Sequence, residues 1–352
     1  MSERNTQTEE TNREESSQRT PRPGMDAISE ALARLYPGQE GRYYGLVLPA
    51  GKKGKDPLDG IEVWESGTEV PHWHYVTYGF SELDGKECGD PDNSGYGFEL
   101  TFRLKKQGEE PPTWPMGMLE RIAGYVFATG NGFSAGHYVD CGGPLTEDGE
   151  TKLRALAFRT DPELGEMDTP NGHLAFLEAV AITGDEMDAL MVWNGEKFLE
   201  QAEAFLPLGI TDPGRDSLMK IPSFCSAWEA GVEADGSSTS FLYMDELRAG
   251  LDGENGLLTL KAERGPEFAR MLRARLGKGR PLYVESRDAV VSFLPGEEAQ
   301  MEIQDGVAAL TIPEAGLEEL CRVLTEQRRS SQLEQLPLTV EMIPSETEHT
   351  AG

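Results

Sequence analysis

The stretch GFELTFRLK (97–105) carries the clearest secondary-structure signal in the sequence. Apolar and polar residues alternate along it without a break, with Phe98, Leu100, Phe102 and Leu104 on one side and Glu99, Thr101, Arg103 and Lys105 on the other. A period of two is typical of a β-strand that buries one face and leaves the other in water. The sequence therefore predicts a sheet with one core-facing and one solvent-facing side.

Further strands and helices are predicted on both sides of this strand. The expected strands are 44–48, 61–64, 73–80, 152–158 and 174–182, and the expected helices begin near residues 27, 114, 185 and 197. They interleave without the regular strand–helix–strand spacing of a doubly wound parallel sheet. A second group follows, with strands at 257–261, 282–285, 289–293, 300–303 and 308–312 and helices at 266–276 and from Pro313.

The length of 352 residues exceeds that of one ordinary domain. The fold class we predict is α/β (α+β), with two lobes that are each a mixed, mostly antiparallel sheet packed with helices. The predicted division is a disordered polar tail (1–25), an N-terminal lobe (26–215), a linker rich in Gly, Pro, Asp and Ser (216–236), a smaller C-terminal α/β lobe (237–345) and a disordered tail (346–352).

The net charge and the distribution of apolar residues indicate which kinds of partner and which cellular location to expect. Lys and Arg total 32 against 62 Asp and Glu, so the formal net charge is −30. Such a surface repels phosphate backbones and favours basic partners, so nucleic acid is not expected. No stretch reaches the ~20 apolar residues of a membrane span, and the polar N-terminus lacks a secretory signal, so no membrane association is expected. Four scattered cysteines fit a reducing compartment, and the predicted location is cytoplasmic.

One sequence motif matches the pattern of a serine hydrolase site. GFSAG (132–136) matches the nucleophile elbow and His137 follows it. The elbow requires a strand before Ser134 and a helix after it, but here a predicted helix precedes and an extended stretch follows. No dinucleotide or P-loop motif is found. We therefore predict a protein without enzymatic activity or cofactor, and a serine hydrolase that uses Ser134 stays a distant alternative.

Two patterns bear on metal binding. DPDNSG (90–95) begins like a calcium loop, but the position of its bidentate glutamate is Thr101, so a polar turn is the better interpretation. His72 and His74 share one face of a predicted strand and would need distant ligands such as His137, Cys88 or Cys141 to complete a metal site. Hydrogen-bonded imidazoles at a sheet rim are the better interpretation here, and no metal is predicted.

A set of short motifs then runs in a fixed order through residues 35–212. They are DPLD (56–59), PHWHY (71–75), YGFSEL (78–83), SGYGFELTFRL (94–104), PPTWP (111–115), YVF (125–127), TP (169–170), WNG (193–195) and ITD (210–212). In this order and spacing the chain resembles the suppressor of fused family. Beyond Asp212 the resemblance thins to DGS (235–237) and a similar order of strands and final helix.

The resemblance implies a two-lobed binding protein. Family members close on an extended partner peptide, which adds as a β-strand between the lobes. In animals the partner is a Gli-type transcription factor, held inactive in the cytoplasm. Tyr125 matches the tyrosine of the peptide site, and His137 stands where the family has an aspartate. We take Tyr125, His137 and Asp140 as the candidate partner-binding residues.

A neutral imidazole at position 137 cannot provide the charge-assisted hydrogen bond that an aspartate provides. The chain also lacks the long disordered insertion of animal members and so resembles the bacterial branch. Some bacterial members are thought to act as immunity proteins that neutralise a toxin domain, and an acidic body suits a basic toxin. We therefore predict that the chain sequesters a protein partner with a basic surface, as an immunity protein would. The alternative is a negative regulator of a transcription factor, as in animals.

Overall fold

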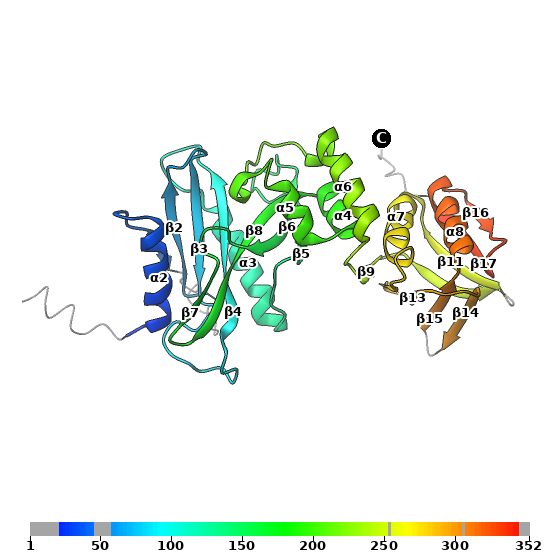
Figure 1. The fold of residues 1–352 in the computed structure, drawn as a ribbon, viewed down its shortest axis with the longest axis horizontal. Coiled ribbons are helices and arrows are strands. Elements are labelled where there is room, and N and C mark those ends of the chain that lie inside the picture. The colour runs from blue at the N-terminus through cyan, green and yellow to red at the C-terminus, as the bar shows by residue number, and fades with distance from the viewer. Residues whose placement is uncertain (1–20, 46–57, 253–254, 305–306, 345–352) are drawn as a thin grey trace, which may run out of the picture.

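The computed structural model describes residues 21–45, 58–252, 255–304 and 307–344. An eight-stranded sheet and its helices form one part, and two smaller sheets with two helices form the other; helices α4 (Gly184–Val192), α5 (Gly195–Ala202) and α6 (Pro222–Asp235) lie between them (Figure 1). This is a mixed α/β fold in which helices pack on mixed sheets, as the sequence predicts.

The eight-stranded sheet has the order β1-β2-β3-β4-β8-β6-β5, and β7 pairs with the outer part of β8. Its strands are β1 (Arg42–Gly45), β2 (Gly60–Ser66), β3 (His72–Tyr78), β4 (Asn93–Lys105), β5 (Tyr138–Asp140), β6 (Leu153–Thr160), β7 (Glu166–Thr169) and β8 (Gly172–Thr183). All pairs are antiparallel except β4 with β8. The two long strands β4 and β8 form the centre.

The prediction that one face of β4 lies in water is wrong. Its apolar side packs under helix α3 (Trp114–Thr129), but its polar side is buried as well, and Glu99, Thr101 and Arg103 are fully inaccessible. Helix α2 (Pro23–Leu35) covers that second face and packs with side chains of β3 and β8. The polar residues alternate there because each one bonds to polar groups of neighbouring strands and turns beneath the helix, not because they meet solvent.

The C-terminal part holds two sheets, whereas the sequence predicts a single one. One has the order β10-β11-β17-β16 and the other β14-β15-β13-β12-β9. The strands are β9 (Phe241–Tyr243), β10 (Arg248–Asp252), β11 (Asn255–Lys261), β12 (Leu282–Glu285), β13 (Val290–Pro295), β14 (Gln300–Gln304), β15 (Val307–Ile312), β16 (Ser330–Gln332) and β17 (Leu338–Ile343). Three of their seven pairings, β11 with β17, β13 with β15 and β12 with β9, are parallel.

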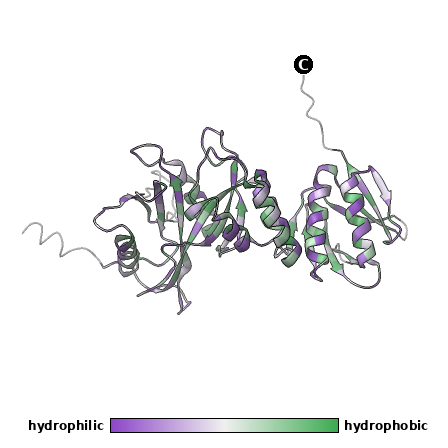
Figure 2. Ribbon diagram, turned by 45° about the horizontal axis from the view of Figure 1, so that its top comes forward, coloured by the Kyte–Doolittle hydropathy of each residue, from purple (hydrophilic) through white to green (hydrophobic). Residues whose placement is uncertain are grey.

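Two amphipathic helices, α7 (Gly265–Leu276) and α8 (Glu314–Glu326), share a core with both of these sheets. Figure 2 shows hydrophilic and hydrophobic segments alternating along them, as expected of helices with one buried side. Pro313 caps α8 instead of beginning it. The predicted strands and helices of this region are present within two residues of their expected bounds, whereas the sequence patterns do not predict β9, β10, β16 and β17.

The segment 216–236, predicted from its composition to be a linker, is mostly helical. It contains a 3-10 turn (Leu218–Lys220) and helix α6, whose Phe224 and Trp228 are buried. These side chains belong to one hydrophobic cluster that also takes in the C-terminal sheets. The chain then turns at Gly236, whose φ of 68° and close approach to the Ala274 carbonyl leave no room for a side chain. The proposed lobe boundaries themselves remain predictions.

Other expectations fall partly outside the described residues. Of the predicted tail 1–25, residues 1–20 are not described, and α2 already begins at Pro23. The tail 346–352 also lies outside. Of the predicted strand 44–48, residues 44 and 45 belong to β1 and the rest are not described.

Candidate functional site

Two sheet edges from the two parts of the molecule flank one cavity. Strand β5 ends the eight-stranded sheet, and β9 ends the five-stranded sheet. Between them lies a cavity of about 430 Å³. It is lined by Tyr125, Gly132, Phe133, Gly136, His137 and Tyr138 from the first part and by Ser238, Thr239, Ser240 and Phe241 from the second. A terminal strand exposes unpaired N–H and C=O groups, so both walls offer backbone hydrogen bonds.

The wall at β5 is held by the loop that follows α3. The helix ends at Gly130 in the left-handed conformation, which redirects the chain. The Gly136 N–H then donates to the Phe158 carbonyl at 2.8 Å, and the Phe158 N–H donates to the His137 carbonyl at 2.9 Å, so the loop extends the pairing of β5 with β6. The carbonyl of Gly136 lies so close to Gly195 of α5 that a Cβ there would overlap it. Helix α5 therefore sets the position of this loop.

The wall at β9 is anchored by the serines before it. The Ser237 N–H donates to the Ala274 carbonyl of α7 at 2.9 Å, while its hydroxyl donates to the Met191 carbonyl of α4 at 2.6 Å. The Ser238 N–H donates to the Trp193 carbonyl at 2.6 Å. These bonds tie the approach to β9 to both parts of the molecule and fix the separation of the two edges.

The backbone of β9 is oriented for pairing on its open side. The Ser240 carbonyl accepts from Tyr283 of β12, and the Met244 N–H donates to Glu285 of the same strand, both at 2.9 Å. Successive residues of a strand direct their backbone groups to opposite sides. The N–H and C=O groups of Phe241 and Tyr243 therefore face the open edge.

The structure brings two of the three candidate residues together. The Tyr125 side chain is 46% exposed and lines the cavity, with its ring against Phe133. His137 lines the same cavity. Asp140 is not among the lining residues: its carboxylate forms an ion pair with Arg154 at 3.0 Å and accepts from the Gly142 N–H.

The cavity is neutral in a chain of net charge −30. None of its lining residues is Asp, Glu, Lys or Arg. What it offers is aromatic surface from Tyr125, Phe133 and Phe241, hydroxyl groups from serine, threonine and tyrosine, and open backbone edges. A site of this kind suits a peptide backbone, whose polar groups are uncharged and must be paired when they leave water.

The hydrolase alternative has no support in the local geometry. The Nδ1 atom of His137 accepts from the backbone N–H of Ser134 at 3.3 Å, so that lone pair is directed at an amide. The residues after Ser134 lead into strand β5, whereas a nucleophile elbow needs a helix there.

The Nδ1 atoms of both candidate histidines contact protein groups. His72 and His74 are both fully buried; Nδ1 of His72 lies 2.8 Å from the Val70 carbonyl, and Nδ1 of His74 lies 2.8 Å from the Tyr36 hydroxyl. They lie inside the fold and not at a rim. The Asp90 carboxylate accepts from the backbone of Asp92 and Asn93, which is a polar turn. Within the described ranges, no cluster of three or more potential metal ligands is found.

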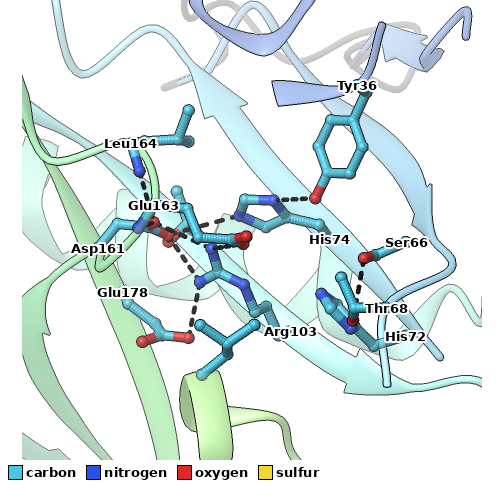
Figure 3. A network of polar contacts seen from close by, with 12 residues as sticks. Tyr36, Ser66, Thr68, His72, His74, Arg103, Asp161, Glu163, Leu164 and Glu178 are labelled. Atoms are coloured by element: carbon cyan, nitrogen blue, oxygen red, sulfur yellow. Dashed lines mark hydrogen bonds and ion pairs between the residues drawn. The ribbon is translucent and has the colours of Figure 1, made fainter. Parts of the chain in front are cut away.

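Beside His74 lies an ionic network that the sequence did not reveal (Figure 3). Arg103 of β4 forms a bidentate ion pair with Asp161, at 2.7 and 2.9 Å, and bonds Glu178 of β8 at 2.8 Å and Glu163 at 2.9 Å. Burial opposes the ionisation of Asp161, yet the His74 ring at 3.5 Å and the charge and hydrogen bonds of Arg103 hold its pKa well below the usual range. Burial, followed by the charge of Arg103, lowers the pKa of His74 to about 4.

This network positions the sheet and does not face the cavity. It joins β3, β4, β8 and the turn after β6 beneath α2, with Tyr36 reaching it from the end of that helix. The only signal in the sequence was the polar half of the alternation in β4. Buried charges of this kind are costly unless every one is paired, so the network fixes which strands lie side by side.

The fold and part of the sequence match known proteins. Residues 54–216 match the family model described as suppressor of fused protein. The human and mouse suppressor of fused homologues are each 33% identical over 236 residues, which is 62% of this chain and 49% of the relative. The chain thus spans about half the length of these curated relatives.

Solved structures extend the likeness to both parts. The crystal structure of Drosophila suppressor of fused superposes with a TM-score of 0.74 over 92% of this chain and 97% of that one, at 21% identity. A chain of the crystal structure of a Sufu–Fu complex superposes with a TM-score of 0.54 over 58% of this chain and 97% of that one, at 32% identity.

The molecule is therefore a mixed α/β protein with the suppressor of fused fold across most of its length. In residues 54–216 the sequence is also similar to the suppressor of fused family, as the family model and the 33% identity to the human homologue show. No helix among the described residues is both long and apolar enough to cross a bilayer.

Proposed function

We propose that the chain is a non-enzymatic binding protein that holds an extended segment of a partner protein between β5 and β9. The observation that carries this proposal is the single neutral cavity that both open sheet edges flank. A strand laid in it can pair its backbone on both sides, which gives affinity without dependence on sequence, while Tyr125, Phe133 and Phe241 select the side chains. The solved complex of Sufu with Fu supports a protein as the partner.

The partner we propose carries a basic surface. A chain of net charge −30 attracts cationic proteins and speeds their association. Many toxin domains that act on nucleic acids have such surfaces, so an immunity protein that sequesters a toxin in the cytoplasm is the favoured form of this function. The four cysteines are all free thiols, in keeping with a reducing compartment. The alternative form is a regulator of a transcription factor, and the 33% identity to the human suppressor of fused homologue is the reason to retain it.

The test is affinity capture of the tagged chain from a lysate of its own source, with identification by mass spectrometry. Three baits are compared: the unchanged chain, Tyr125→Ala in the cavity, and Leu251→Ala, an exposed apolar residue on another sheet. We expect one stoichiometric protein that Tyr125→Ala loses and Leu251→Ala retains. A partner captured equally by all three baits would show that the cavity is not the binding site.

A further inference from the structure

The outer face of the five-stranded sheet is an apolar surface that nothing in the described structure covers. Its inner face packs on α7 and α8, through residues such as Val284, Phe293 and Leu310. The outer face carries five exposed large apolar side chains: Phe241 and Tyr243 of β9, Tyr283 of β12, Val290 of β13 and Val307 of β15, each between 36% and 52% exposed. We call this set the outer apolar face.

The strand register makes these side chains neighbours. Phe241 is the partner of Tyr283 across β9 and β12, and Val290 is the partner of Val307 across β13 and β15. Tyr243 and Val290 are both partners of Glu285, one on each side of it. Contiguous exposed apolar side chains of this kind mark an interaction surface more often than single exposed ones do.

The carboxylate of Glu285 lies inside this surface, and the side chains of Asp245 and Arg287 interact with Tyr243 at its margin. Glu285 is exposed, and among the described residues no cation lies within ion-pair distance of it. A ligand that covered the face would have to neutralise this carboxylate or leave it buried and unpaired, which is costly. The face therefore favours a ligand with apolar side chains and one cation.

The described chain offers no occupant of its own. Residues 1–20 contain one large apolar side chain, Met1, and residues 345–352 contain none. The segment 46–57 joins β1 to β2, which lies five strand spacings, or roughly 24 Å, from β5. A loop of twelve residues that begins and ends at neighbouring strands can extend at most about 20 Å from them. That distance is too short to reach β5 or the outer apolar face beyond it.

A second copy is also a poor occupant. Each chain has a net charge of −30, so two copies repel. A two-fold contact through the face would enclose two Glu285 carboxylates, and the Arg287 side chain beside the face already interacts with Tyr243. A different protein with a basic surface is attracted by the negative charge of the chain and can supply the cation that Glu285 needs.

The face adjoins the cavity between the two edges. Phe241 belongs to both: its side chain lines the cavity, and its backbone lies at the open edge of β9. A strand paired to that edge directs alternate side chains onto the same outer face. Such a strand would lie about 10 Å from β12. A lysine or arginine of the strand can extend over the Tyr243 ring and meet the Glu285 side chain, and the two side chains together are long enough to span that distance.

We propose that the partner segment held at β9 also covers the adjoining part of the outer apolar face, on β9 and β12, with apolar residues at alternate positions and a lysine or arginine that pairs with Glu285. This inference rests on the proposed function, because the same segment must first pair with β9. It adds the sequence pattern that the partner must show.

The experiment selects ligands from random sequences, so the partner need not be identified first. A phage library of random twelve-residue peptides is panned against the full chain, and the enriched peptides are synthesised and their Kd values measured by fluorescence anisotropy. Each peptide is measured on the unchanged chain, Glu285→Lys, Tyr283→Ser, Tyr125→Ala and a control, Ile303→Ser. Ile303 is 39% exposed on the same sheet but pairs with Ala308 on the opposite face.

We expect enriched peptides with alternating apolar residues and a basic residue. Their affinity should fall at least tenfold in Glu285→Lys and Tyr283→Ser and stay unchanged in Ile303→Ser, and a peptide whose basic residue is replaced by glutamate should prefer Glu285→Lys. Melting temperatures of all variants check that each one folds.

The other outcomes overturn the inference at separate points. If Tyr125→Ala alone abolishes peptide binding, the proposed site between β5 and β9 stands, but the outer apolar face is not part of it. Peptides indifferent to Tyr125→Ala, or no enrichment at all, would remove the proposed function together with the inference. A dimer in sedimentation velocity that Val290→Lys abolishes would assign the face to a second copy instead.

Discussion

Arg103 and Asp161 lie beneath helix α2 in a bidentate ion pair in which neither side chain reaches water. The pair joins the central strand β4 to the turn after β6, and Glu178 of β8 completes the neutralisation of the guanidinium. Asp161 therefore depends on this buried cation, whereas Glu178 also forms an ion pair with Arg159 at 2.7 Å.

Replacing Arg103 by methionine should destabilise the protein severely. The change keeps the volume of the side chain but leaves the Asp161 carboxylate buried without its cation and leaves Glu178 only its ion pair with Arg159, which costs about 3–5 kcal/mol. Urea unfolding followed by circular dichroism measures the loss. The matched control is Arg154→Met, whose ion pair with Asp140 is 45% and 41% exposed and should be worth less than about 1 kcal/mol. Equal losses in both variants would contradict the role of burial.

Stability should fall as the pH drops from about 6.5 to about 4, in part because of His74. Burial lowers the pKa of its imidazole to about 4 in the folded protein, from 6.5. Between these two pH values His74 is protonated in the unfolded chain but stays neutral in the folded protein. Acidification therefore favours unfolding, by on the order of 3 kcal/mol.

The variant His74→Asn isolates this contribution. Asparagine keeps a polar group near the Tyr36 hydroxyl, 2.8 Å from Nδ1 of His74, but does not titrate. The difference in unfolding free energy between the unchanged chain and the variant should shrink by that amount between pH 7 and pH 4. Parallel pH profiles would show that His74 is protonated in the folded protein as readily as in the unfolded chain.

The open edge of β9 can be tested through its backbone. Phe241→Pro removes an N–H that faces the edge and not β12, so the strand pairing with β12 is kept. Against the captured partner, Phe241→Pro should bind roughly tenfold more weakly than Phe241→Ala, which lacks the ring but keeps the N–H. Isothermal titration gives both affinities. Equal affinities would mean that no backbone pairing occurs at this residue.

The position of the loop at β5 depends on Gly195. Because a Cβ at this position would overlap the Gly136 carbonyl, Gly195→Ala should displace the loop that carries His137 and weaken partner binding about tenfold or more. The matched control is Gly124→Ala inside α3, where a Cβ has open space. That control should stabilise the protein by about 0.5–1 kcal/mol through helix propensity and leave binding unchanged. Thermal melts and the same titration read out both effects, and unchanged binding in Gly195→Ala would show that α5 does not position the loop.

Much of the fold follows from local patterns. The alternation in residues 97–105 locates β4, and apolar spacing locates α3 and α7 near their observed bounds. Periodicity could not show the partner of each polar residue. The alternation predicts that Glu99, Thr101 and Arg103 face solvent, because the acids that pair with Arg103 lie 58 to 75 positions away in the sequence. Helix α6 was missed because its first turn follows a stretch of Gly, Pro and Asp that is typical of loops.

The candidate site could be predicted only on one side. Motif order pointed to Tyr125 and His137, and both line the cavity, but Asp140 is engaged with Arg154. The opposite wall, from Ser238 to Phe241, has three polar residues and one aromatic, a pattern without a signature. It becomes a wall only because Ser237 and Ser238 bond to α4, α7 and Trp193, contacts that no local pattern encodes.

The parallel pairing of β11 with β17 has a consequence for the order of folding. The two strands are about eighty residues apart in the chain, yet β17 lies between β11 and β16 and contributes Leu338, Val340 and Met342 to the core that α7 shares. During synthesis the second part of the molecule cannot close its core until residue 343 has left the ribosome. Until then the core that supports β9 is incomplete, so we expect the molecule to capture a partner only after residue 343 has left the ribosome.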